Sequence, residues 1–255
     1  MAPYDILGNI VIMKFSRDIT SSQKKIVARE FLDTHQNVTT VLEKTDRLKG
    51  RLRIPGVKYI AGVKTTEAIY KENGCIFRFD VTSSYFSPRL STERAELARK
   101  IKKGESVLVL FGGVAPFAVV ISKTGKPKKV VTIELGKIPS KYAEMNVKSN
   151  KVKVQVIQGD VRRLLPKMKE KFDRVIMTRP NLKDDFLDVS LPRVKSGGIL
   201  HYYGFYSEDR LDDLKRLLIT KSFEAKRKIK ILNIKKAGDV GVREFRYRVD
   251  TKLIN

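Results

Sequence analysis

Small and acidic residues stand at the ends of three consecutive apolar runs, where they could hold a ligand. The first run leads into Gly112 and Gly113, within residues 111–117 (FGGVAPF). Glu134 closes the second run, and Asp160 follows the third. Glycines let a ligand lie close to backbone N–H groups. One carboxylate can accept hydrogen bonds from both hydroxyls of a ribose, and another from an adenine amino group. Together these residues favour an adenosine-type ligand.

The glycine pair taken alone has a plainer interpretation, which is a tight turn between a strand and a helix. The chain has no G-x-G-x-x-G pattern and no P-loop lysine pattern. Dinucleotides and nucleoside triphosphates are therefore weaker candidates for the ligand.

The elements that must position these residues follow an alternating order. Five short β-branched runs are separated by segments long enough for helices, including residues 139–150 and 182–192, and Ser207 is expected to cap a further helix after the last run. This alternation predicts a parallel sheet with crossover helices, and ligands bind at the carboxyl ends of such strands. Residues 228–234 and 243–249 alternate and predict an antiparallel hairpin. A mostly parallel sheet closed by such a hairpin is typical of S-adenosylmethionine (SAM) methyltransferases. The five runs are residues 106–111, 129–135, 152–157, 174–177 and 198–203.

Residues 1–84 have a different pattern, which predicts a small α+β module. Short strands are expected near residues 8–15, 38–43, 58–63 and 75–81, with a helix capped by Ser21 or Ser22. That helix is expected to turn Ile26, Val27, Phe31 and Leu32 toward a core. We therefore divide the chain into a module of residues 1–84 and a doubly wound α/β domain of residues 85–255.

The composition of the chain favours some partners and excludes some kinds of site. The 255 residues include 53 Lys+Arg and 28 Asp+Glu, a formal net charge of +25. Residues 1–100 carry +7 and residues 101–255 carry +18, which indicates a polyanionic partner such as nucleic acid. One cysteine and two histidines argue against a disulfide scaffold and a zinc site, so no metal is expected. We see no membrane span or signal peptide and expect a cytoplasmic, monomeric protein.

Residues 84–94 (SYFSPRLSTER) carry the most specific pattern in the chain. They resemble the interdomain signature of the archaeal/eukaryotic-type tRNA (guanine-N1) methyltransferases. That family uses SAM to methylate the guanosine 3′ of the anticodon, at position 37. A related enzyme of the wybutosine pathway transfers an aminocarboxypropyl group on the same nucleoside, but it differs at this signature. Further segments match the family in the same order: residues 4–8, 60–62, 71–74, 111–117, 159–162 and 201–203.

The resemblance implies roles for individual residues. Glu93 matches the base that removes the guanine N1 proton, and Arg51 matches the arginine that stabilises the charge on O6. Chemically the pair is reasonable, because N1 is a poor nucleophile until its proton leaves. Thr178 and Pro180 match positions that help to hold the guanine. The positions that match SAM contacts in the family are Tyr85, Arg89, Arg94, Phe111, Glu134, Leu135 and Asp160.

Three segments depart from the family pattern. An acid–Met–Phe–Ala–Gly run is replaced by residues 109–113 (VLFGG), and an Asn-Pro pair by Gly136-Lys137. An Asn-Leu-Pro segment is replaced by Thr178-Arg179-Pro180, and a threonine cannot copy the paired donor and acceptor of an amide.

We therefore expect N1 methylation of guanosine 37 in the anticodon stem-loop of tRNA. Two alternatives remain open. One is a wybutosine-pathway transferase, moving an aminocarboxypropyl or a methyl group on the same nucleoside. The other is an RNA-binding protein with a degenerate SAM pocket, which the three departures motivate.

Overall fold

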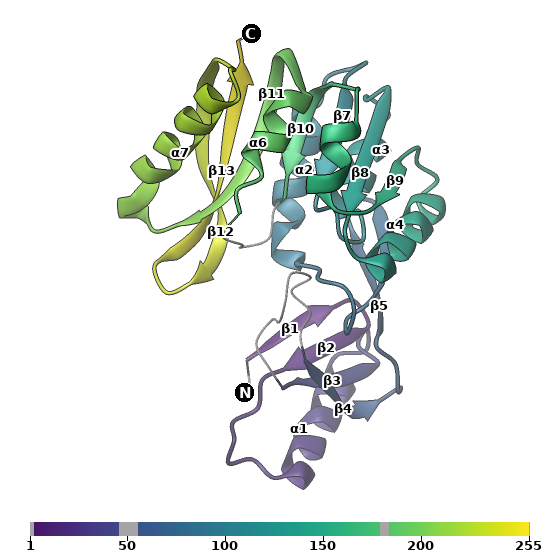
Figure 1. The fold of residues 1–255 in the computed structure, drawn as a ribbon. Helices are drawn as coiled ribbons and strands as arrows, with labels where there is room; N and C mark the ends of the chain where they lie inside the picture. Colours follow the sequence, from purple (N-terminus) through teal and green to yellow (C-terminus); the bar gives the residue numbers. More distant parts are fainter. Residues whose placement is uncertain (1–2, 46–55, 179–183, 255) are drawn as a thin grey trace.

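The computed structural model describes residues 3–45, 56–178 and 184–254, which form a smaller N-terminal lobe and a larger C-terminal lobe (Figure 1). Within the described residues, the N-terminal lobe holds a four-stranded sheet in the order β1-β2-β3-β4. The pair β2/β3 is parallel, and the pairs β1/β2 and β3/β4 are antiparallel. The strands are β1 (Tyr4–Leu7), β2 (Ile10–Met13), β3 (Thr40–Lys44) and β4 (Val57–Gly62).

Helix α1 (Ser21–Thr34) packs on this sheet and begins one residue earlier than expected. Thr20 caps it, because its side chain accepts a hydrogen bond from the Gln23 N–H while Gln23 bonds back to the Thr20 N–H. Ala28 and Phe31 are buried. The prediction for Ile26 was wrong: it is 57% exposed, because the stripe set by Ala28 and Phe31 leaves Ile26 on the far side of the helix.

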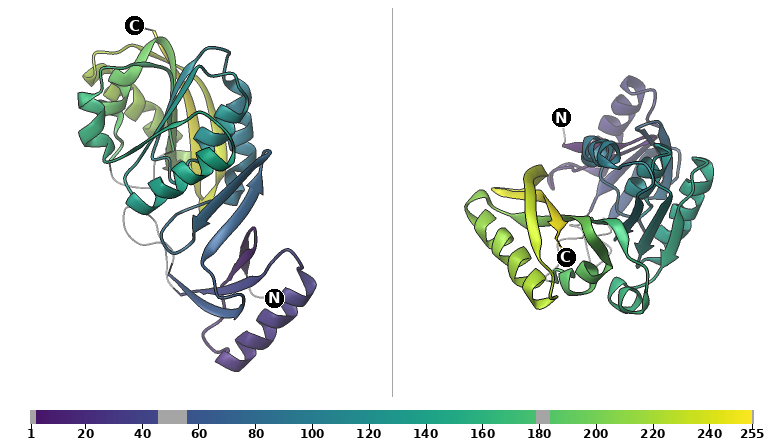
Figure 2. Two further views of the ribbon diagram at one scale, coloured as in Figure 1. Left: turned by 90° about the vertical axis from the view of Figure 1, so that its right-hand side faces the viewer. Right: turned by 90° about the horizontal axis from the view of Figure 1, so that it is seen from above.

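A two-stranded hairpin, β5 (Glu67–Glu72) and β6 (Cys75–Asp80), lies between the lobes (Figure 2). Its turn is Asn73-Gly74, and both residues have positive φ, as a tight hairpin turn requires. Phe77 and Phe79 of β6 are fully buried in a core that includes side chains from both lobes. Strand β5 was not expected from the sequence.

The C-terminal lobe contains a seven-stranded sheet in the order β12-β13-β11-β10-β7-β8-β9. The five strands from β11 to β9 are parallel neighbours, whereas β13 is antiparallel to both β11 and β12. The expected mostly parallel sheet with a C-terminal antiparallel hairpin is therefore present. The strands are β7 (Ser106–Leu110), β8 (Lys129–Glu134), β9 (Gln155–Gln158), β10 (Phe172–Met177), β11 (Val194–Tyr206), β12 (Ile229–Gly241) and β13 (Glu244–Leu253).

Helices cover both faces of this sheet, and each face has its own core. On β7, Val107 and Val109 belong to the core that contains α2 and α3, whereas Leu108 and Leu110 belong to the core that contains α6 and α7. Alternate residues of a strand point to opposite faces, so β7, all of whose residues are buried, serves both cores. The helices are α2 (Ser91–Lys100), α3 (Pro116–Lys123), α4 (Lys137–Ser149), α5 (Val161–Leu164), α6 (Leu187–Ser190) and α7 (Leu211–Glu224).

The helix expected over residues 182–192 is much shorter than predicted. Among residues 184–192, which the structure describes, only Leu187–Ser190 is α-helical, and the 3-10 turn Leu191–Arg193 follows it. Pro192 explains the early end, because proline has no N–H to donate to the Asp188 carbonyl, which would be the next hydrogen bond of the helix. Among residues 3–45, 56–178 and 184–254, no helix has the length and apolar character needed to span a bilayer.

Candidate functional site

The loop after β7 holds a conformation that is costly for ordinary residues. Phe111 and Ala115 have φ of 61° and 64°, in the left-handed region that side chains with a Cβ rarely adopt. The space beside Gly112 does not admit a side chain in this backbone conformation, because an added Cβ would lie 2.0 Å from Thr132 Oγ1. Backbone strain of this kind is concentrated at ligand sites. The loop therefore brings its backbone N–H groups close to the end of β8.

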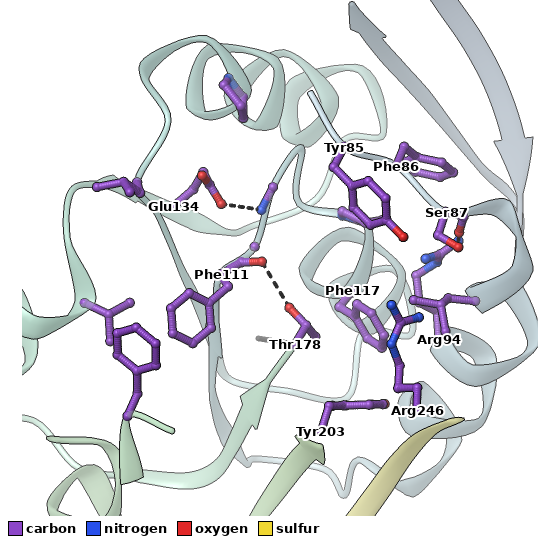
Figure 3. Close-up of a pocket in the computed structure, with 18 of the residues that line it drawn as sticks. Tyr85, Phe86, Ser87, Arg94, Phe111, Phe117, Glu134, Thr178, Tyr203 and Arg246 are labelled. Carbon is purple, nitrogen blue, oxygen red and sulfur yellow. Dashed lines mark hydrogen bonds between the residues drawn. The ribbon is translucent and has the colours of Figure 1, made fainter. Parts of the chain in front are cut away.

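Glu134, the last residue of β8, is tied to this loop. Its Oε2 accepts a hydrogen bond from the Gly113 N–H at 2.8 Å (Figure 3). Its Oε1 accepts one from the Gly136 N–H, also at 2.8 Å. Burial raises the pKa of the Glu134 carboxyl, and these backbone N–H groups partly offset the rise. Each carboxylate oxygen has two lone pairs, so each retains one acceptor position for a ligand hydroxyl.

These elements border a pocket at the carboxyl edge of the parallel strands, which we call the strand-edge pocket (Figure 3). The linker between the lobes supplies its opposite wall. Most of the residues singled out from the sequence line it, although they come from positions as far apart as 85 and 178. Those residues are Tyr85, Arg94, Phe111, Glu134, Leu135, Asp160 and Thr178.

Thr178 joins two strand ends. Its hydroxyl lies 3.0 Å from the carbonyl oxygens of both Leu110 and Phe111, to which it donates. Because a hydroxyl has a single hydrogen, Thr178 can offer a ligand only an acceptor. The side chain thus fixes the end of β10 beside the strained loop.

Arg94 is buried and paired with Glu72 of β5. Its Nη2 donates to Glu72 Oε2 at 2.5 Å and to the Ser87 carbonyl at 3.0 Å, while Nε donates to the other carboxylate oxygen. The guanidinium carbon lies 5.0 Å from the centre of the Phe86 ring and 5.6 Å from that of Phe117. Arg94 therefore holds the linker in place as well as lining the pocket.

A second pocket, which we call the interlobe pocket, adjoins the first. It lies between β1 and β2, the linker and the far end of the β12–β13 hairpin. Arg89 lines this pocket and not the strand-edge pocket, so it is separated from every other expected SAM contact except Tyr85, which lines both. Its side chain is 72% exposed and donates to Asp5 Oδ1 at 2.7 Å. The two pockets share Tyr85, Phe86, Ser87, Leu90 and Arg246.

Glu93 lies behind the wall of the strand-edge pocket and is not among the lining residues of either pocket. It is 4% exposed, and its Oε1 accepts a hydrogen bond from the Tyr203 hydroxyl at 2.7 Å. Arg248, which is fully buried, donates to the same oxygen. Arg248 also donates to Glu96 at 2.7 Å and to Asp250 at 2.8 Å.

Tyr203 stands between this buried network and the pocket. Its side chain lines the strand-edge pocket, while its hydroxyl bonds to Glu93. Burial and the nearby Glu93 carboxylate raise the pKa of Tyr203 well above its ordinary value. The Tyr203 hydroxyl therefore stays protonated and donates a hydrogen bond to Glu93.

Arg51 and Pro180 lie outside the described residues, so the structure does not place them. The sequence analysis did not single out Arg246 and Arg248 on β13. A signal for them was present, because REFRYRV alternates charged and apolar residues. Charged side chains on one face of a sheet-forming strand require partners or a ligand when buried.

Comparison with known proteins agrees with this arrangement. Residues 68–232 match the family model described as the TRM5/TYW2 methyltransferase domain. The chain belongs to the TRM5/TYW2 methyltransferase family. The resemblance inferred from the sequence is confirmed, as is the SAM-methyltransferase fold class. Residues 2–65 match a second model, the TYW2 N-terminal domain.

Relatives in the TRM5/TYW2 family carry different enzyme names. The chain is 37% identical over 206 residues to a tRNA (guanine(37)-N(1))-methyltransferase Trm5b of Pyrococcus abyssi, covering 80% of the chain and 60% of that protein. It is 31% identical to Taw22 of Nanoarchaeum equitans, a tRNA (guanine(37)-N(1))/4-demethylwyosine(37)-methyltransferase, over 98% of the chain and 99% of the relative. A tRNA(Phe) aminocarboxypropyltransferase of Methanocaldococcus jannaschii is 32% identical over 80% of the chain and 79% of the relative.

Solved structures of the family have the same fold. A complex of aTrm5 with tRNALeu superimposes with a TM-score of 0.85 at 30% identity, covering 99% of this chain and 72% of the other. Methanocaldococcus jannaschii TYW2 in complex with AdoMet gives 0.75 at 26% identity, covering 98% and 99%.

Proposed function

We propose that this protein transfers the methyl group of SAM to N1 of guanosine 37 in tRNA. The observation that carries the proposal is the pair of joined pockets. One presents a carboxylate at the end of β8, and the other is open to a larger ligand and is lined by Lys14, Lys44, Arg89 and Arg246. A cofactor and an anionic nucleotide could meet where the pockets join. The proteins named Trm5b and the complex with tRNALeu support tRNA as the substrate.

The residues of the strand-edge pocket fit SAM. Glu134 would accept from the ribose hydroxyls, Asp160 and Leu135 would border the adenine, and the Phe111 loop would approach the methionine portion. The glycine at 112 leaves no side chain in the way, and the Glu134 carboxylate is already fixed by two N–H groups. SAM supplies an electrophilic methyl group when it is bound.

We assign the removal of the N1 proton to Glu93, acting through Tyr203. Because Glu93 lies behind the pocket wall, the Tyr203 hydroxyl would take the N1 proton while giving its own proton to the Glu93 carboxylate. The lone pair left on N1 would then attack the methyl carbon, and the positive charge on sulfur would be neutralised. General-base help of this kind accelerates reactions by about 10²–10⁴-fold. Arg51 remains the proposed partner of guanine O6, and Thr178 and Pro180 the proposed contacts of the guanine.

Methylation of a wybutosine precursor on the same nucleoside is a second candidate. The Nanoarchaeum equitans relative favours it, because that protein is matched over almost its whole length and is named for both substrates. The acceptor site of this protein would then take a tricyclic base as well as guanine.

The test is incubation with a tRNA transcript and SAM labelled in either the methyl or the carboxyl carbon, followed by nucleoside identification. We expect methyl label in N1-methylguanosine and no label from the carboxyl carbon. A transcript with adenosine at position 37 is the control and should remain unlabelled. Carboxyl label in the product would instead indicate aminocarboxypropyl transfer. Failure to bind SAM would favour the RNA-binding alternative.

A further inference from the structure

Arg246 lies near the start of β13, where it lines both pockets. This strand runs antiparallel to β11, so its first residues lie at the edge where the parallel strands end (Figure 1). Arg246 pairs with Phe205 in the β11 register, and it lines both the strand-edge and the interlobe pocket. Its side chain is half-buried at the point where the two pockets join.

Arg246 belongs to a row of charged residues on one face of β13. Arg246, Arg248 and Asp250 alternate along the strand and therefore point to the same side. Arg248 is paired with Glu93, Glu96 and Asp250, and Asp250 also bonds to His201. Arg246 differs from both, because no carboxylate in the described residues lies within ion-pair distance of it.

Arg94, the other arginine that lines the strand-edge pocket, does have a carboxylate partner. Arg94 is already bound on two nitrogens by Glu72. The guanidinium of Arg246 contacts only an aromatic face in the described part of the chain, with its carbon 5.3 Å from the centre of the Phe205 ring. Its hydrogen-bond donors are therefore available to a ligand. A planar guanidinium binds carboxylate and phosphate oxygens in pairs, and such charge-assisted bonds are the strong ones.

Figure 3 places Arg246 and Glu134 on opposite sides of the pocket. We propose that Arg246 binds an oxyanion of a ligand where the two pockets join. This inference rests on the proposed function, which supplies two sources of such an oxyanion. One is the methionine carboxylate of SAM, and the other is a phosphate of the target nucleotide. If Arg246 holds the methionine carboxylate, it also orients the sulfur of SAM. That orientation would decide which of the carbons bonded to sulfur faces the acceptor base.

The experiment compares Arg246→Gln and Arg246→Lys with the parent protein. Calorimetry measures the affinity for SAM, S-adenosylhomocysteine and methylthioadenosine, the last of which has no carboxylate. Filter binding measures the affinity for a tRNA transcript over a range of salt concentrations. Arg243→Gln is the matched control, because Arg243 is exposed at the turn of the same hairpin. Thermal unfolding checks that each variant is folded.

If the oxyanion is the SAM carboxylate, Arg246→Gln should weaken SAM and S-adenosylhomocysteine by about 10- to 100-fold and leave methylthioadenosine unchanged. If it is a phosphate, SAM affinity should stay the same, while RNA affinity and the magnitude of the salt slope should both fall. Arg246→Lys should restore part of the loss in either case.

Two results would overturn the inference. One is an Arg246→Gln protein that binds all four ligands as the parent does, and the other is an equal loss for methylthioadenosine, which would indicate general damage to the pocket. Failure of the proposed function looks different, because it would be seen in the parent protein itself, either as no SAM binding or as no methyl transfer to guanosine 37.

Discussion

At the scale of single residues, Glu134 combines a structural and a binding role. Its carboxylate fixes the strained loop after β7 through Gly113 and the start of α4 through Gly136. The same oxygens keep the lone pairs that a ribose would need. Loss of the charge should therefore affect cofactor affinity more than overall stability, because the loop also bonds to β8 through the Gly112 N–H and to Thr178.

We expect Glu134→Gln to weaken SAM binding by about 1.5–3 kcal/mol, the usual value of hydrogen bonds to a charged group. The amide can accept at one of the two N–H groups, but its NH₂ would face the other. Calorimetry with SAM measures the effect, and Glu144→Gln on the exposed side of α4 is the control. A folded Glu134→Gln protein with parental SAM affinity would contradict the pocket assignment.

A second residue-scale prediction concerns Glu93 and Tyr203. Glu93→Gln and Tyr203→Phe should each slow single-turnover methyl transfer by about 10²–10⁴-fold, and the double variant should be little slower than the singles, because the two residues act as one relay. Tyr203→Phe retains the ring that packs against Phe117.

The control for this prediction is Glu96→Gln, which also removes a partner of Arg248 but leaves Glu93 and Tyr203 in place. Its rate should remain near that of the parent. An equal loss in Glu96→Gln would show that an unpaired Arg248, rather than a missing base, causes the defect. A Glu93→Gln protein that works at the parental rate would remove Glu93 from the mechanism.

At the scale of elements, helix α4 holds the β5–β6 hairpin by two asparagine side chains. Asn146 Oδ1 accepts from the Arg78 N–H at 2.8 Å, and its Nδ2 donates to the Arg78 carbonyl at 3.1 Å and to the Val114 carbonyl at 3.0 Å. Asn150 bonds in the same way to both backbone groups of Ile76. These amides satisfy the edge of β6 as a neighbouring strand would.

The match to the methyltransferase domain begins at residue 68, inside β5. The boundary expected near Ser84 stays a proposal. The hairpin contacts both lobes, so chain order alone does not assign it to one of them.

We expect Asn146→Ala to lower the free energy of unfolding by about 1–3 kcal/mol, since it leaves buried backbone groups of β6 and Val114 without partners. Urea unfolding measures this change, and the slope with denaturant should stay the same. Lys141→Ala, at an exposed position of α4, should change stability by less than about 0.5 kcal/mol. Equal stability of both variants would show that packing alone holds the hairpin.

At the scale of the whole molecule, the positive charge is divided between structural and exposed cations. Within the basic stretch of residues 221–236, Arg227 donates to the carbonyls of Leu191 and Val194, and Lys235 pairs with Glu96. Such residues are poor choices for testing RNA contact, because their removal would disturb the fold. Lys14 and Lys44 are exposed and line the interlobe pocket.

We expect tRNA binding to weaken steeply with salt, and Lys14→Gln and Lys44→Gln each to reduce the magnitude of the log–log slope by about 0.7–0.9. Lys169→Gln is the control, because this exposed lysine precedes β10 and lies near the opposite edge of the sheet. Filter binding at several salt concentrations gives the slopes. If Lys169→Gln reduces the slope as much as the other two, the interlobe pocket is not the RNA contact.

The amino-acid sequence by itself determined the sheet and most of the strand-edge pocket. Gly112, Glu134 and Asp160 could be grouped without a structure, because parallel strands bring their carboxyl ends to one edge. Local patterns also predicted α4 and the C-terminal hairpin, although the hairpin is longer than its alternating residues indicated.

Only the tertiary structure decided which charges meet. Arg94 pairs with Glu72, 22 residues away, and Arg248 with Glu93, 155 residues away. No periodicity within one segment specifies such pairs, because they form between side chains of elements packed by the hydrophobic core. The same reason explains why Arg246 stayed unnoticed in the sequence: that it has no carboxylate partner among the described residues is a property of the neighbours that folding places around it.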